Sequence, residues 1–186
     1  MRIRVLTPRI DSDTLRNRES NYPLRREAAM KVHPGRYTAR IEGDFVVFVI
    51  GMRINKLWKV HRWAPVAAAM GPMLRELFTH PEKGLLAVQY GWSGRTITLI
   101  QHWRSFDQLE KFARDRDDPH LEAWRAFNRK VGTSGDVGVF HETYRVRPGD
   151  YEAVYSNMPV MGLAVAGEHI PVGQRGESAR ERISSR

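Results

Sequence analysis

The chain has 186 residues, 41% of them hydrophobic, and a net charge of +9, which is enough apolar material for one domain with flexible ends. It contains no Cys, which excludes disulfides, thiolate metal sites and a cysteine nucleophile. No apolar run approaches the about 20 residues of a membrane helix, and the first residues lack the apolar core of a signal peptide. We therefore expect a cytoplasmic protein without a membrane partner.

Much of the positive charge lies at the two ends of the chain, in residues 1–30 and 175–186. The middle of the chain carries no helix-turn-helix, zinc-finger or aromatic RNA-binding pattern. A solvated basic surface is the simpler interpretation, and a nucleic-acid partner is not expected.

The first half of the chain is predicted to contain an extension, a strand and a helix. Residues 1–29 are polar, Arg-rich and aperiodic, which favours a flexible extension. A continuous Phe/Val/Ile run after a Gly-Asp turn predicts a strand over Asp44–Ile54. Apolar residues at helical spacing predict a helix over Leu57–Thr79, which Pro65 and Pro72 are expected to break or kink.

The second half is predicted to contain a hairpin, a two-part helix and a last strand. The hairpin strands are Gly84–Trp92 and Arg95–Trp103, joined by a tight Ser93-Gly94 turn. Helical spacing predicts Phe106–Arg116 and His120–Lys130, and an apolar run predicts a strand over Gly135–Val146.

We place the folded domain at residues 30–150. The segment 151–172 (YEAVYSNMPVMGLAVAGEHIPV) is too apolar for a free tail and is predicted to be a C-terminal arm or lid. Residues 173–186 are predicted to be disordered because they are polar, charged and aperiodic.

The element order β-α-β-β-α-β is typical of an α+β, ferredoxin-like fold, in which two helices cover one face of a four-stranded antiparallel sheet. The first strand is apolar on both parities, with Phe45, Val47 and Val49 on one side and Val46, Phe48 and Ile50 on the other. Both sheet faces are therefore expected to be buried, the second one by another copy of the chain in a homodimer.

Three stretches resemble a monooxygenase-like family of the dimeric α/β-barrel superfamily. They are GDFVVFVIGMRINKLWKVHRW, QHWRSFDQLEKFARDRDDPHLEAWRAFNRKVG and GVFHETYRVRPGDYEAVYSNMPVMGL, within about residues 35–166. The resemblance implies a pocket within each monomer, between helices and sheet. Its relatives include cofactor-free monooxygenases, haem-degrading monooxygenases and haem-binding dehydratases, so the fold leaves the reaction open.

Arg53 and Asn55 end the first strand on one parity and are candidate catalytic residues. The Asn55 amide can donate a hydrogen bond to a substrate oxygen or to iron-bound dioxygen. Alternatively, Asn55 caps the following helix, since Asn is a favoured N-cap residue.

Aromatic residues are the candidate lining of the substrate pocket. Trp58, Trp103 and Trp124 together suggest a flat apolar ligand, although core packing is the commoner role for any one of them. Tyr155, in the arm, is a candidate lid residue, and dimer packing is its alternative role.

Two strand histidines, His102 and His141, are candidate haem ligands, and His141 is also a candidate general base. His141 is expected to be functional if it faces the helices and structural if it faces the dimer seam. The cluster Asp115, Asp117, Asp118 and His120 matches no standard metal site and is interpreted as a solvated turn.

The leading functional hypothesis is a monooxygenase-type oxidoreductase acting on a small hydrophobic or aromatic molecule, with haem or with no cofactor. The alternatives are a haem-dependent lyase of the aldoxime-dehydratase kind and a non-enzymatic ligand-binding or regulatory dimer. No dinucleotide or P-loop glycine pattern is present.

Overall fold

A four-stranded antiparallel sheet forms the centre of the computed structural model, which describes residues 31–114, 129 and 132–184. Its strands are β2 (Phe45–Ile54), β3 (Leu85–Ser93), β4 (Thr96–Trp103) and β5 (Val137–Val146). They are arranged in the order β3-β4-β2-β5, so β4 and β2 are central. This is the ferredoxin-like arrangement, and the predicted α+β fold is confirmed.

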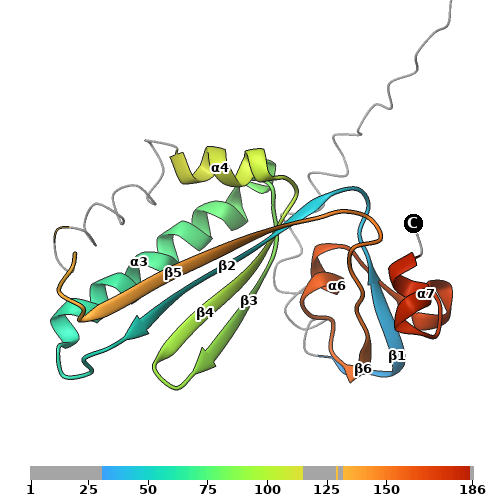
Figure 1. Cartoon of the computed structure of the whole chain (residues 1–186), viewed down its shortest axis with the longest axis horizontal. Coiled ribbons are helices and arrows are strands. Elements are labelled where there is room, and N and C mark those ends of the chain that lie inside the picture. The colour runs from blue at the N-terminus through green and yellow to red at the C-terminus, as the bar shows by residue number, and fades with distance from the viewer. Residues whose placement is uncertain (1–30, 115–128, 130–131, 185–186) are drawn as a thin grey trace, which may run out of the picture.

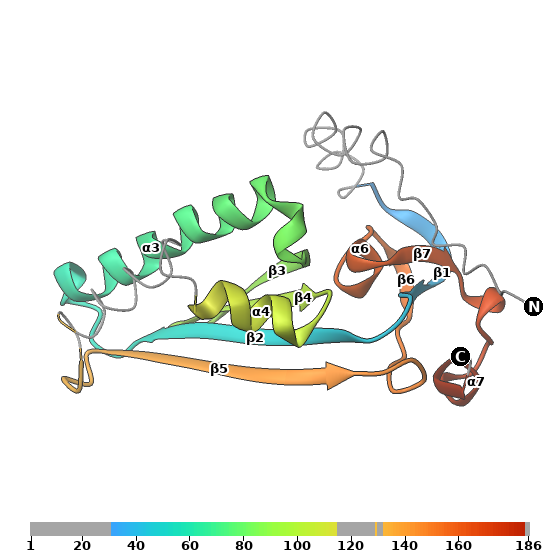
Figure 2. The same ribbon diagram turned by 90° about the horizontal axis from the view of Figure 1, so that it is seen from above.

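Two of the described helices cover one face of this sheet, α3 (Val60–Thr79) and α4 (Phe106–Arg114), with a short turn η1 (Pro81–Lys83) after α3 (Figures 1 and 2). Of the predicted helix at His120–Lys130, the structure describes Arg129, which is helical. The predicted break in α3 is wrong, because the helix continues through Pro65 and Pro72. Both prolines are exposed, as are His61 and Ala68 four residues before them, so water can reach the carbonyl groups that lose their partners.

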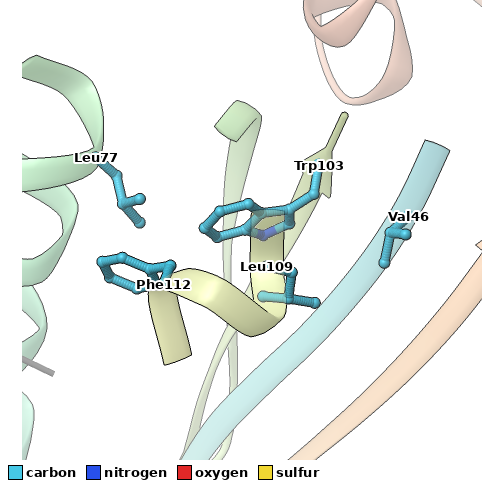
Figure 3. Packing of buried hydrophobic residues seen from close by; sticks show 5 residues of the cluster. All are labelled: Val46, Leu77, Trp103, Leu109 and Phe112. Atoms are coloured by element: carbon cyan, nitrogen blue, oxygen red, sulfur yellow. The ribbon is translucent and has the colours of Figure 1, made fainter. Parts of the chain in front are cut away.

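The helices and the sheet enclose two separate apolar clusters. One joins Val46 and Trp103 of the sheet to Leu77 of α3 and to Leu109 and Phe112 of α4 (Figure 3). The other lies near the first turns of α3, where Trp63, Val66 and Ala67 pack on Met52, Ile54 and Val137. Even-numbered residues of β2 therefore point toward the helices, and odd-numbered residues point to the opposite side, which we call the outer face.

A second, three-stranded sheet stands at one end of the molecule (Figure 1). Its order is β6-β1-β7, and its strands are β1 (His33–Arg40), β6 (Tyr155–Met158) and β7 (Glu168–Pro171). The sequence did not predict β1. Between the last two strands lies α6 (Leu163–Ala166), where Gly162 lies against Gln89 on the outer face of β3: a Cβ at Gly162 would be 2.9 Å from Gln89 Oε1.

Residues 172–184 are structured, so the predicted disorder of the tail is wrong over this range. They form η2 (Val172–Gln174) and α7 (Ala179–Ser184). Two arginines hold them in place. Arg175 donates to the carbonyl oxygens of Ala39 at 2.7 Å and Arg182 at 2.9 Å. Arg182 is 4% exposed and binds the Glu152 carboxylate. Charged composition suggested disorder, but these guanidinium groups are buried and paired.

No helix in the described ranges is both long enough and apolar enough to cross a membrane.

Candidate functional site

Strand register determines which side chains share the helix-covered side of the main sheet. Two adjacent rows run across all four strands there. The rows are Val88–Gln101–Phe48–Thr143 and Tyr90–Leu99–Ile50–His141. We call these eight residues the central band.

The central band lies between the two apolar clusters, and its cover is incomplete. Leu99 is 3% exposed and Gln101 5% exposed, whereas Tyr90 is 67% exposed and His141 is also exposed. On α3, Met70 shares the helical face of Trp63 and Leu77 and is half-buried. A buried floor with accessible polar and aromatic side chains at its edges can receive a small, flat molecule.

His141 lies on the helix side, which meets the condition that we set for a functional role. It pairs with Ile50 across the strands, and its ring centroid is 5.7 Å from that of Phe48. An exposed imidazole beside an aromatic ring can act as a proton acceptor for a molecule resting on that ring.

His102 lies on the outer face and so does not share a site with His141. It is 5% exposed, its ring is 6.5 Å from that of Phe45, and its Nδ1 has no hydrogen-bond partner in the described part of the chain. Burial lowers the pKa of His102 below its ordinary value, because the protonated ring would lose its hydration. The two predicted haem ligands are therefore on opposite sides of the sheet.

Arg53 and Asn55 do not join the central band, and the predicted grouping of these two residues with the tryptophans in one pocket is wrong. Arg53 pairs with Gly138 on the outer face, where a Cβ at Gly138 would lie 3.8 Å from Arg53 Cβ. The Asn55 amide donates to the carbonyl oxygen of Gly135 at 3.1 Å and so fixes the loop before β5. Asn55 does not cap α3 either, since the N-cap position is Lys59.

The tryptophans are spread over the molecule rather than gathered in one pocket. Trp103 is 0% exposed, with its ring 5.7 Å from that of Phe112. Trp58 is 74% exposed, and Trp63 belongs to the second cluster. Trp124 lies outside the described residues. Trp103 adjoins the central band next to Gln101 on β4, as part of its support.

Tyr155 is a strand residue of the second sheet and does not form a lid over the central band. Its hydroxyl oxygen accepts the Ala164 backbone N–H at 3.4 Å, and burial raises its pKa. Its ring is 6.0 Å from that of His169. The arm 151–172 is therefore predominantly a partner of β1, which the sequence did not reveal.

Sequence reasoning missed Gln101. Its side chain is buried on the helix side and accepts the Trp103 indole N–H at 2.9 Å (the indole nitrogen is blue in Figure 3). One signal was present: Gln101 is the only amide in the apolar strand TITLIQHW, on the parity of Leu99 and Trp103. A buried polar residue between apolar ones is the informative exception in a core strand.

Cofactor ligands are few on this side of the sheet. Within residues 31–114, 129 and 132–184, no group of three or more His, Asp or Glu side chains could hold a metal ion. The cluster Asp115, Asp117, Asp118 and His120 lies outside these ranges. His141 is an exposed imidazole and fits the requirement for an axial haem ligand.

The sheet order and the one-sided helices define an α+β protein of ferredoxin-like fold. Within that fold, the chain belongs to the Monooxygenase af470-like family, whose model matches residues 45–163. The predicted family is thereby confirmed.

A curated relative is "Monooxygenase af470" of Aspergillus fumigatus, 31% identical over 127 residues. The alignment covers 62% of this chain and 44% of the relative, so the chain spans less than half of the relative's length.

Solved structures with a related fold are more distant. A dimeric protein of unknown function and ferredoxin-like fold from Bacteroides fragilis has a TM-score of 0.36 and 12% identity, covering 55% of this chain and 96% of that one. Rv0793 from Mycobacterium tuberculosis has a TM-score of 0.35 and 18% identity, covering 52% and 92%. Similarities this low carry no argument about function.

Proposed function

We propose that the protein is a monooxygenase-type oxidoreductase that binds a small aromatic molecule on the central band. The observation that carries the proposal is the position of His141. Among the residues of the central band it is the one strong proton acceptor, and it adjoins the Phe48 ring at 5.7 Å between centroids. Membership of the Monooxygenase af470-like family supports the reaction class.

The proposed reaction needs a substrate with an activated methylene group, such as one flanked by aromatic rings. The His141 ring accepts a proton from this carbon and leaves a carbanion, which the rings delocalise. The carbanion gives electrons to dioxygen and forms a C–O bond. Loss of water from the resulting hydroperoxide leaves a ketone, so that R₂CH₂ + O₂ gives R₂C=O + H₂O.

In this scheme the protein supplies position and proton transfer. Phe48 and Ile50 form an apolar surface against which the rings rest, and Leu99 closes the floor beneath. Water excluded from this surface would otherwise protonate the carbanion. His141 can return its proton to the peroxide anion, which gives the hydroperoxide. It can then move the remaining C–H proton to the departing hydroxide, which leaves as water.

Oxygen consumption with anthrone as the probe tests the proposal. We expect consumption above the spontaneous rate for the native chain and a loss of about 10² to 10⁴-fold in His141→Gln, the range for removal of a general base. His61→Gln on the exposed side of α3 is the matched control and should retain the native rate. Equal rates in the native chain and His141→Gln contradict the proposal.

Haem is the alternative source of oxygen activation, and His141 is the residue that would hold it. Bound haem would supply iron chemistry to the same apolar surface. An absorption spectrum taken before and after addition of hemin distinguishes the two schemes. A saturable Soret shift that His141→Gln removes assigns haem, whereas no shift together with anthrone oxidation assigns the cofactor-free scheme.

We also propose that a second copy of the chain covers the outer face. Large side chains there are exposed in the single chain: Ile100 is 36%, Phe140 39% and Tyr144 52% exposed. Sedimentation equilibrium should show a dimer, which Phe140→Arg dissociates and Tyr90→Arg, on the helix side, leaves intact. A native monomer at all concentrations contradicts this assembly.

A further inference from the structure

Gln101 is the one amide in the floor of the central band. It lies on central strand β4, is 5% exposed and pairs across the strands with Phe48 on one side and Val88 on the other. An amide buried this deeply is normally satisfied by several hydrogen bonds. In the described residues its side chain has one, from the Trp103 indole nitrogen at 2.9 Å.

That hydrogen bond determines the orientation of the Gln101 side-chain amide. An indole N–H can only donate, so it requires the amide oxygen as its acceptor. Trp103 is itself held rigidly, with 0% exposure and contacts to Leu77, Leu109 and Phe112. The Oε1 atom of Gln101 is thereby fixed toward Trp103, and the two N–H groups of Nε2 point elsewhere.

The Gln101 nitrogen has no hydrogen-bond partner in the described part of the chain, and the residue, which lies on the helix side of β4, is 5% exposed. A donor oriented by a rigid neighbour and left unused is suited to an acceptor that arrives with a ligand.

We propose that Gln101 is a substrate-binding residue that donates to an oxygen atom of the substrate, and that Trp103 is its positioning residue. This inference rests on the proposed function and narrows its substrate to aromatic molecules that carry a hydroxyl or keto oxygen. The donor strengthens as negative charge collects on that oxygen, as it does when a carbanion delocalises into an adjacent carbonyl group.

The register also sets the size of the substrate. Gln101 and His141 are two strands apart and one row apart. Strand spacing of about 4.8 Å and a rise of about 3.4 Å per residue place their Cα atoms about 12 Å apart. With side chains extending inward from both positions and Phe48 between them, a molecule of two or three fused rings spans the gap. Its oxygen lies at the Gln101 end and its acidic carbon at the His141 end.

A purely structural role for Gln101, as acceptor for a buried indole, makes a different prediction. Gln101→Glu retains an oxygen for Trp103 but replaces the two N–H groups with a second oxygen. Gln101→Leu removes both functions at similar volume. If the role is structural, Gln101→Glu should be stable and should bind ligands as the native chain does. If Gln101 binds the substrate, the same variant should lose affinity only for ligands that carry oxygen.

The test compares 2-naphthol with naphthalene by calorimetric titration at pH 8.5, with thermal melting as the check on folding. In the native chain 2-naphthol should bind at least tenfold more tightly than naphthalene. Gln101→Glu and Gln101→Leu should reduce that ratio to about twofold while naphthalene affinity stays within about twofold. Trp103→Phe, which frees the amide to rotate, should give an intermediate ratio. Thr98→Val, on the outer face of the same strand, is the control and should keep the native ratio.

Equal affinity of the native chain for the two probes, or an unchanged ratio in a folded Gln101→Leu variant, overturns the inference. These outcomes are separate from those of the proposed reaction. A Gln101-dependent ratio without anthrone oxidation leaves the binding role in place and removes the oxygenase. Anthrone oxidation that depends on His141, together with an unchanged ratio of 2-naphthol to naphthalene affinity in the Gln101 variants, keeps the oxygenase and removes the binding role of Gln101.

Discussion

Phe140 of β5 lies directly over Gly51 of β2 on the outer face of the main sheet. A Cβ atom at Gly51 would lie 2.5 Å from Phe140 Cε1 and 2.7 Å from the carbonyl oxygen of Ile97. No side chain fits at this position while the ring stays where it is, so glycine is required for the ring to lie against the backbone.

Gly51→Ala should therefore lower the free energy of unfolding by about 1–3 kcal/mol, the usual range for overpacking. Chemical denaturation measures it. Gly91 is the matched control, since it occupies the same row and face and its nearest contact would be Thr98 O at an ordinary 3.8 Å. In a Phe140→Ala background the loss should shrink but persist, because the Ile97 carbonyl group remains. An equal loss at Gly91 would show that contact with Phe140 is not the cause.

Asp136 should stabilise the fold only above acidic pH. Hydrogen bonds from Lys56 and Lys59 hold the pKa of its carboxyl group at about 2, below the ordinary 3.8. The folded state therefore binds fewer protons than the unfolded state between these values. This contribution is complete above pH 3.8 and is lost as the pH falls toward 2.

In Asp136→Asn this contribution is absent, so the melting temperature should fall less steeply between pH 4 and 2 than it does in the native chain. Melting temperatures measured at half-unit steps check the slope. Asp44→Asn, at an exposed position, should retain the native profile. If the native and Asp136→Asn curves run parallel, the two lysines do not act in this way.

Two histidines, the buried His102 and the half-buried His169, should make the fold less stable as the pH falls below neutrality. Burial lowers the pKa of His102, and burial together with the neighbouring His33 lowers the pKa of His169, both from 6.5. Because both pKa values are lower in the folded chain, the unfolded chain takes up protons on these histidines at a higher pH than the folded chain does. The contribution of the two neutral rings to stability is complete above pH 6.5 and falls as the pH drops toward their folded-state pKa values.

His102→Leu should remove part of this slope, measured by urea denaturation between pH 7.5 and 5. His169→Leu should do the same and also loosen the stack that Tyr37 makes on His169, whose ring centroids are 4.4 Å apart. The exposed His61→Gln serves as the reference. A native slope in His102→Leu would count against the burial of this residue in the neutral form.

Arg182 should be essential for the attachment of the C-terminal helix. Its guanidinium group binds Glu152 and donates to the carbonyl oxygens of Gly176 at 3.0 Å and Glu177 at 2.8 Å. Arg182→Met leaves a partly buried carboxylate unpaired, which typically costs about 3–5 kcal/mol. Hydrogen exchange should rise in residues 168–184, whereas Arg180→Met, at an exposed position in the same helix, should leave it unchanged. Native protection in Arg182→Met would contradict this role.

The main sheet was predictable because its strands carry their own signals. Phe45–Ile54 is a continuous β-branched and aromatic run, and the hairpin that follows α3 has a tight turn with Gly94 at positive φ. In contrast, β1 reads HPGRYTAR, and its partners begin more than 110 residues later in the chain. Short polar strands of this kind are defined by pairing at long range, which local patterns do not contain.

The sequence could not predict on which face of the main sheet each candidate residue lies. Because β2 is apolar on both parities, nothing within it says which parity the helices cover. In the structure Arg53 and His102 lie on the outer face, and Phe48, Gln101 and His141 lie on the helix side. A shift of one residue would exchange these positions. Packing of Leu77 and Leu109 on Val46 settles the choice, and that contact involves distant segments.

The three-stranded sheet places β1 between two strands from the other end of the chain, with Tyr37 opposite Tyr155 on one side and Pro171 on the other. During synthesis on the ribosome, β1 therefore emerges long before either partner exists. At translation rates of about 5–20 residues per second, it waits on the order of ten seconds for β7. The main sheet can form first, and a nascent chain that stops before β7 leaves one edge of β1 open to chaperones and proteases.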